Sequence, residues 1–327
     1  MTDDITLFEE IATTRERFIS EVGKVIVGQQ EPIELLLISL LAGGHCLFVG
    51  VPGLAKTLLV RTAAQALGLD FGRVQFTPDL MPADILGTEV LEENRATGRR
   101  AMRFIPGPVF TNLLLADEIN RTPPRTQAAL LQAMQEREIT VAGASRTLDE
   151  PFVVLATQNP IEQEGTYPLP EAQLDRFMFS VPVDYPTEDE EVEVVQRTLQ
   201  PQLPTLEPVI SLETLLAQRA LVRRVPTSEA VRRYAVKLAR STRPVPGQTD
   251  GACRWIQWGA GPRASQNLLL GARVRALLRG HEVPDIRDVR ALAPAVLGHR
   301  IVLNFEAEAS GVTTAEVVAG LLDELPA

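Results

Sequence analysis

The segment Gly50-Val51-Pro52-Gly53-Leu54-Ala55-Lys56-Thr57 constrains the fold of this chain more than any other. It is a glycine-bearing turn that ends in Lys-Thr. Residues 46–49 before it form an apolar run typical of a buried strand, and residues 58–67 after it follow a helical pattern that ends at Gly68. The turn is therefore expected directly after a strand and at the N-terminus of a helix.

A turn in that position is suited to binding phosphate, because unpaired N–H groups and the positive end of the helix dipole favour an anion. Lys56 can reach the β- and γ-phosphates, and the Thr57 hydroxyl can ligate Mg²⁺. Ala55 stands where the general pattern G-x-x-x-x-G-K-[ST] has its second glycine, and a positive φ there would cost about 1 kcal/mol. For the loop alone, an ordinary strand–turn–helix corner stays open as the alternative.

A second apolar run, residues 113–116, ends in the two adjacent carboxylates Asp117 and Glu118. Beside a phosphate-binding loop, Asp117 would complete the Mg²⁺ shell and Glu118 would orient the attacking water. The alternative is a surface pair that caps a helix beginning near Pro123. The phosphate-binding pattern upstream makes that alternative the weaker one.

A third apolar run, residues 152–157, leads into Asn159. If this strand lies beside the one that carries Asp117, the Asn159 amide would lie near a γ-phosphate and could position its water. The alternative is an Asn-Pro turn in which the amide bonds its own backbone.

Two arginines complete the set of candidates. Arg176 follows a short helical stretch, and Arg263 opens a helix in the C-terminal region. An arginine inserted into a phosphoryl-transfer site can contribute roughly 10³ to 10⁵ in rate. Either could instead form a structural ion pair, Arg176 for example with Asp175 or Glu171.

The order of these parts resembles the AAA+ ATPases and, within them, the MoxR family, over nearly the whole chain. Ala55 in the loop matches the MoxR form. The segments that carry the resemblance are Gly-Val-Pro-Gly-Leu-Ala-Lys-Thr (50–57), Gln-Phe-Thr-Pro-Asp-Leu (75–80), Leu-Leu-Leu-Ala-Asp-Glu-Ile-Asn-Arg (113–121), Leu-Leu-Gln-Ala-Met-Gln-Glu-Arg (130–137), Ala-Thr-Gln-Asn-Pro (156–160), Leu-Asp-Arg-Phe (174–177) and Pro-Arg-Ala (262–264).

The resemblance implies ATP and Mg²⁺ as cofactors. It implies catalytic roles for Glu118 in Walker B, Asn159 as sensor 1, Arg176 as an arginine finger and Arg263 as sensor 2. Thr57 and Asp117 would hold the metal. The nucleotide-binding residues are then Gly50, Pro52, Gly53, Leu54, Ala55, Lys56, Thr57 and Leu58, together with Val27 and Gly28 upstream.

The expected fold class is α/β: a P-loop NTPase (AAA+) αβα core with a parallel sheet over residues 1–186, followed by a smaller all-α lid domain over 187–327. Thr187 with Glu190 reads as a capping box that starts the second region. Helical patterns follow at 211–224, 228–242, 263–279, 285–297 and 313–325.

Two segments, near 88–104 and 138–148, are expected to be hairpins inserted into the core. One interpretation is that both are ordinary surface hairpins. Similarity to the helix-2-insert branch of AAA+ proteins, which includes magnesium chelatase subunits, implies that they project toward a ring centre and touch the substrate. The family resemblance implies such a ring, a hexamer, in which the finger reaches a neighbour's nucleotide and sensor 2 contacts its own.

The net charge of -10 is unevenly placed. Residues 201–327 carry 16 basic and 12 acidic side chains, whereas the preceding residues carry 16 and 30. An acidic chain disfavours non-specific nucleic-acid binding, which needs clustered Lys and Arg. The expected function is Mg-dependent ATP hydrolysis coupled to chaperone-like remodelling or maturation of partner protein complexes, with a von Willebrand factor A domain protein as partner. A nucleic-acid motor and an ATP-gated scaffold with little turnover are the alternatives.

The two cysteines, Cys46 and Cys253, have no metal-binding spacing, which favours a reducing cytoplasm. The N-terminus is acidic where a signal peptide would be basic, and the apolar stretch 35–49 is broken by Gly43-Gly44-His45 and too short to span a bilayer. A cytoplasmic protein without a membrane anchor is expected.

Overall fold

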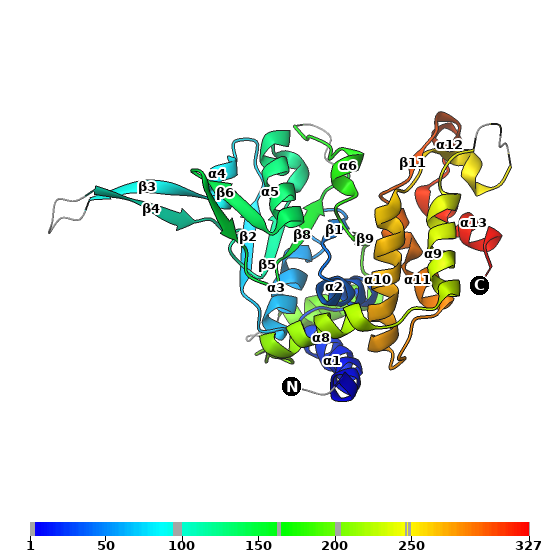
Figure 1. Cartoon of the computed structure of the whole chain (residues 1–327), viewed down its shortest axis with the longest axis horizontal. Coiled ribbons are helices and arrows are strands. Elements are labelled where there is room, and N and C mark those ends of the chain that lie inside the picture. The colour runs from blue at the N-terminus through cyan, green and yellow to red at the C-terminus, as the bar shows by residue number, and fades with distance from the viewer. Residues whose placement is uncertain are drawn as a thin grey trace.

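The central element of the computed structural model is a five-stranded parallel sheet, shown with the whole chain in Figure 1. The structure describes residues 4–93, 100–161, 165–199, 204–245, 247 and 250–326. The strands lie in the order β2 (Phe71–Gln75), β5 (Leu113–Asp117), β8 (Val153–Gln158), β1 (Cys46–Val49) and β9 (Phe179–Pro182). Because all are parallel, the tips of β5, β8 and β1 meet at one edge, as the sequence predicts.

Helices cover both faces of this sheet, which confirms the αβα class. Side chains alternate along β5, so that Leu113 and Leu115 join an apolar cluster on one face while Leu114 and Ala116 join a second cluster on the other. The first face packs against helices α1 (Asp4–Gly23), α2 (Gln30–Ala42) and α3 (Lys56–Ala66). The second packs against α4 (Pro82–Leu86) and α5 (Pro124–Glu136).

Both inserted hairpins are present. The first pairs β3 (Gly87–Glu93) with β4 (Arg100–Pro106), and its turn, with Arg95 and Gly98, lies outside the described residues. The second pairs β6 (Glu138–Val141) with β7 (Ala144–Thr147). The Arg146 guanidinium lies 3.7 Å from the centroid of the Phe104 ring and 3.6 Å from Glu89, so the second hairpin braces the first. Figure 1 shows β3 and β4 extending far from the body.

The C-terminal part is helical, as expected. After α6 (Glu171–Leu174) and α7 (Glu188–Thr198) it comprises α8 (Leu212–Arg224), α9 (Glu229–Ser241), α10 (Pro262–Leu278), α11 (Ile286–Leu297), α12 (Phe305–Ala309) and α13 (Thr314–Glu324). The capping boxes at Thr187 and Thr313 start α7 and α13. The expectation of an all-α lid is wrong in one detail, since β10 (Ile256–Trp258) pairs with β11 (Val302–Leu303).

One apolar cluster runs from the first helices into the lid. It contains Phe18 of α1, Leu36 of α2, Leu268 of α10 and Leu292 of α11, all at most 2% exposed. The lid therefore packs directly against α1 and α2. The domain boundary at 186–187 stays a prediction. Over the described residues, no helix has both the length and the apolarity needed to cross a bilayer.

Candidate active site

The phosphate-binding loop lies between β1 and α3, with two residues in the left-handed region. Gly53 has a φ of +87° and Ala55 a φ of +54°. Ala55 is the N-cap of α3, so the methyl group does sit where the pattern has glycine and where a side chain costs about 1 kcal/mol. A Cβ on Gly50 would come within 2.5 Å of the Val183 carbonyl oxygen, so only glycine fits there.

Lys56 folds back over this loop. Its ammonium group donates a hydrogen bond to the Gly50 carbonyl. Partial burial lowers the pKa of Lys56, and the nearby carboxylates of Asp117 and Glu118 oppose that shift. The cation is thus held within the concavity of the loop, facing the two acidic side chains at the tip of β5.

A hydroxyl and a carboxylate converge beside the loop. Thr57 Oγ1 donates to Asp117 Oδ2 over 3.3 Å, and Thr157 Oγ1 donates to Asp117 Oδ1 over 2.7 Å. Asp117 is only 9% exposed. Hydroxyl and carboxylate oxygens are the ligands that Mg²⁺ takes from proteins when phosphates complete its shell. The pair Thr57 and Asp117 therefore fits the predicted metal site.

Glu118 occupies a strained backbone position at the same strand tip. Its φ is +58°, and its N–H group donates to Thr157 Oγ1 over 2.8 Å. Its Oε2 accepts hydrogen bonds from Gln75 Nε2 at 2.8 Å and from Arg121 at 3.0 Å. Left-handed backbone in a residue other than glycine costs about 1 to 3 kcal/mol, and such strain clusters at functional sites, where surrounding hydrogen bonds hold it.

Sequence reasoning missed Arg73, which contacts the metal-site carboxylate. Its Nη2 and Nε donate to Asp117 Oδ2 over 2.8 and 3.2 Å, and Nη2 also donates to Gln75 Oε1 over 2.8 Å. The available signal was the alternation of Arg73 and Gln75 around the buried Val74, which puts both side chains on one face of β2. Only the pairing of β2 with β5 brings them to the carboxylates.

Asn159 follows β8 and is 5% exposed, close to the strand tip where it was expected. Its Oδ1 accepts a hydrogen bond from the Ile161 N–H group over 3.2 Å. This is the local bond of an Asn-Pro turn, so its role as a water-positioning residue stays a prediction.

A cavity of about 690 Å³ opens beside the loop. Its size is that of a small-molecule site. The predicted nucleotide-binding residues that line it are Val27, Gly53, Leu54, Ala55 and Leu58. Tyr185 and Glu190 also line it. A Cβ on Gly28 would meet the Glu190 carboxylate at 2.3 Å, which explains a glycine with a φ of +64° there.

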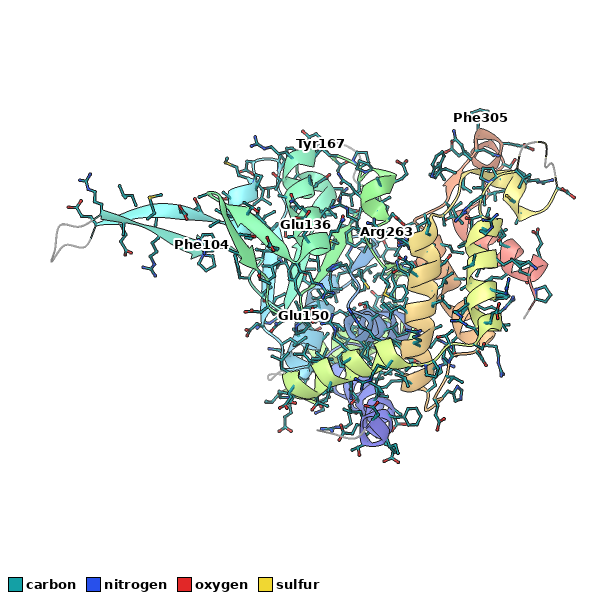
Figure 2. The ribbon with its side chains drawn as sticks, viewed as in Figure 1. Phe104, Glu136, Glu150, Tyr167, Arg263 and Phe305 are labelled. Carbon is teal, nitrogen blue, oxygen red and sulfur yellow. The ribbon has the colours of Figure 1, made fainter. Side chains whose placement is uncertain are left out.

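Arg176 and Arg263 lie elsewhere. Together they line a separate hollow of about 250 Å³ whose wall includes Gly43 and Gly44. These glycines precede β1, whereas the phosphate-binding loop follows it, so the four-residue strand, roughly 13 Å long, separates the two sites. Figure 2 shows Arg263 at the start of α10, beside the α/β part. The structure does not bring Arg263 to the nucleotide site of its own chain, which corrects the expectation for sensor 2.

A second arginine that the sequence did not single out fixes the turn that carries Arg176. Arg300, 6% exposed, donates to the Asp175 carboxylate over 2.8 Å and to the backbone carbonyls of Asp175 and Phe177. Arg263 approaches the same carboxylate at 3.5 Å. Asp175 therefore pairs with these two arginines and not with Arg176, which forms no ion pair within the described part of the chain. The alternative interpretation of Arg176, a structural ion pair with Asp175 or Glu171, is therefore not observed among the described residues.

A parallel sheet with a phosphate-binding loop, acidic residues at a neighbouring strand tip and a helical lid defines the class of P-loop ATPases. Residues 45–179 match the model of the ATPase family associated with various cellular activities (AAA), and residues 251–321 match the AAA lid domain. The chain belongs to the MoxR family of AAA+ ATPases.

Three relatives illustrate the likeness. Chaperone MoxR1 of Mycobacterium tuberculosis is 43% identical over 310 residues, covering 94% of this chain and 81% of the relative. Protein MoxR of Paracoccus denitrificans is 35% identical over 300 residues, covering 86% of each chain. The crystal structure of a candidate ATPase from Cytophaga hutchinsonii superposes with a TM-score of 0.89 at 40% identity, covering 98% of this chain and 96% of that one.

Proposed function

We propose that this protein hydrolyses Mg·ATP and uses the energy to remodel partner proteins. The observation that supports hydrolysis most is the convergence of Thr57 and Asp117, 3.3 Å apart, beside Lys56. In this assignment Lys56 binds the β- and γ-phosphates, and Glu118 holds and polarises the attacking water. When bound, the metal neutralises charge on the phosphates. Asn159, directly after β8, would position the same water.

The positions of Arg176 and Arg263 support an oligomer. Both lie at the amino-terminal edge of the sheet, and the phosphate-binding loop lies at the carboxyl-terminal edge. If either arginine neutralises charge during the reaction, it does so for another copy of the chain. A head-to-tail contact of this kind forms a ring when the rotation between subunits closes. We propose a closed ring of six subunits, with ATP at each interface.

For the biological role we propose chaperone-like maturation of a protein complex in the cytoplasm, with a von Willebrand factor A domain protein as partner. The printed name of one relative, Chaperone MoxR1, favours this class. A nucleic-acid motor of the same branch would also carry the two hairpins, but the net charge of -10 disfavours it. Stimulation of the ATPase activity by DNA at moderate salt would favour such a motor. An ATP-gated scaffold would assemble with ATP and release no phosphate.

Lys56→Ala tests the assignment. Removing the phosphate-binding cation should abolish binding of a fluorescent ATP analogue and phosphate release. Lys237→Ala, on the exposed side of α9, is the matched control and should leave both unchanged. Unchanged nucleotide affinity in folded Lys56→Ala would reject the loop as the binding site. Phosphate release absent from the wild type under all conditions that support binding would favour the scaffold.

A further inference from the structure

We propose that Arg73 occupies the place of the metal at Asp117 and is displaced when Mg²⁺ enters with the nucleotide. Arg73 is thus a positioning residue that sets how strongly nucleotide binding depends on Mg²⁺. This inference rests on the proposed function, because it concerns the same site.

The hydrogen bonds of Asp117 show which of its two oxygens a metal ion would need. Its Oδ1 is taken by the Thr157 hydroxyl at 2.7 Å. Its Oδ2 faces Thr57 at 3.3 Å, and this same oxygen accepts the hydrogen bonds from Arg73 at 2.8 and 3.2 Å. A cation held between Thr57 and Asp117 would therefore need the oxygen that the guanidinium now engages.

The Asp117 carboxylate needs a positive partner because it is buried. The Asp117 side chain is only 12% exposed, and a buried carboxylate without a positive partner is strongly destabilising. Thr57 and Thr157 are neutral, and the nearby Lys56 ammonium bonds the Gly50 carbonyl, so the guanidinium is the cation that contacts the carboxylate directly. A divalent ion at the same oxygen would supply the positive charge instead and would repel the guanidinium.

Arg73 is also free to leave. It lies on β2, the outermost strand of the sheet, and 47% of its side chain is exposed. Its other partner, Gln75 at 2.8 Å, is an exposed neutral amide on the same strand. Once the metal binds Asp117, water can replace the hydrogen bonds that Arg73 makes to Asp117 and Gln75, so displacement requires no movement of the backbone.

The test is a Mg²⁺ titration of binding, followed with a fluorescent ADP analogue, so that no turnover is needed. In Arg73→Ala the metal displaces nothing. The Mg²⁺ concentration for half-maximal binding should fall about fivefold, equivalent to about 1 kcal/mol. Arg73→Lys, which keeps a positive charge, should return it toward the wild-type value. Arg233→Ala, which removes a surface ion pair with Glu229, is the matched control and should change nothing.

A half-maximal concentration that is unchanged or higher in Arg73→Ala would overturn the proposal, because the ion pair would then be incidental or would orient Asp117 for the metal. If the wild type binds no nucleotide, the proposed function itself fails. These two failures are therefore distinguishable.

Thermal unfolding without nucleotide or metal gives an independent measurement. Arg73→Ala should lower the melting temperature in the wild-type background, because Asp117 loses the cation that contacts it. The same change in an Asp117→Asn background should have little effect, because the carboxamide needs no cation. Equal losses in both backgrounds would contradict the proposal even if the Mg²⁺ titration were ambiguous for a less stable variant.

Discussion

The Arg263 guanidinium lies 3.5 Å from the Asp175 carboxylate, so the first turn of the lid helix α10 adjoins the turn that carries Arg176. Both arginines consequently face one hollow at the amino-terminal edge of the sheet. Two hypotheses follow from this shared position: the arginines act on the nucleotide of a neighbouring subunit, or they act on the nucleotide of their own chain. If they serve a neighbouring subunit, variants with complementary defects should repair each other, whereas residues that act within their own chain cannot be repaired in this way.

Arg176→Ala should keep nucleotide affinity within about threefold of the wild type and lower turnover by about 10³, the loss expected for an arginine finger. Lys56→Ala subunits retain Arg176, so an equal mixture of the two variants should restore activity at about a quarter of the interfaces of a randomly mixed ring. Phosphate release measures both effects. Arg287→Ala, which removes an exposed ion pair with Asp285, serves as the control and should behave like the wild type. Mixed rings seen by native mass spectrometry without recovered activity would argue that Arg176 is structural.

The Arg263→Ala variant tests whether Arg263 acts on the nucleotide of its own chain, as the sequence predicts, or on that of a neighbouring subunit, as its position in the structure indicates. An arginine that contacts its own nucleotide would leave every Arg263→Ala subunit defective, so mixing with Lys56→Ala would recover nothing. The place of Arg263 beside Asp175 instead predicts recovery in the mixture, measured as phosphate release at a fixed total protein concentration. A mixture no more active than the Arg263→Ala variant alone would support a movement of the lid that carries Arg263 to its own phosphate-binding loop.

Glu118→Gln should bind ATP and fail to hydrolyse it. The amide keeps the size of the side chain but cannot accept a proton from water, and such a loss of general-base function lowers turnover by about 10² to 10⁴. Gel filtration with radiolabelled ATP, followed by analysis of the bound nucleotide, should show intact ATP. Glu136→Gln, on the exposed end of α5, is the control. Bound ADP in the Glu118→Gln variant would move the catalytic role to another residue.

The parts that sequence predicts best are those encoded by local patterns. Apolar runs located β1, β5 and β8, and helical periodicity located α8 and α10 to within about two residues. The strand tips that carry Asp117 and Asn159 follow from these runs together with the family resemblance. Strands as short as β11, which has two residues, leave no such pattern.

The contacts that sequence could not predict depend on long-range packing. Arg73 meets Asp117 only because β2 pairs with β5 in one register, with Gln75 opposite Asp117, and parallel register is not encoded in either strand alone. Arg300 reaches Asp175 across 125 residues of sequence. The location of Arg263 likewise depends on how α10 docks against α1 and α2, which the helical pattern of the lid does not specify.

Ala55→Gly should stabilise the protein slightly. The φ of +54° strains an alanine by about 1 kcal/mol, and glycine relieves this strain while gaining freedom in the unfolded chain, so a net gain of up to about 1 kcal/mol is expected. Chemical denaturation measures it. Ala291→Gly, at an exposed site within α11, is the matched control and should lose about 1 kcal/mol, because its helical backbone favours alanine. A loss of stability at both positions would mean that Ala55 is not strained.

Protonation of His45 should make the fold sensitive to acid. The buried imidazole links two segments, since its Nδ1 accepts from the Val154 N–H group at 2.9 Å and its Nε2 lies 3.1 Å from the Met134 carbonyl. Only the neutral ring with a proton on Nε2 makes both bonds. Burial lowers the pKa of His45 from 6.5 to about 4, with further contributions from Arg137 and Arg219.

Between these two values the unfolded chain binds a proton that the folded chain does not, so stability is fully present above pH 6.5 and declines as the pH falls toward 4. From pH 7 to 5 the His45 contribution should fall by about 2 kcal/mol. Urea unfolding at both pH values should show a smaller decline in His45→Gln than in the wild type. Part of the decline will remain, because burial also lowers the pKa of His299. The exposed His281→Gln is the control and should retain the wild-type decline, and an equal decline in His45→Gln would exclude His45 as the acid-sensitive group.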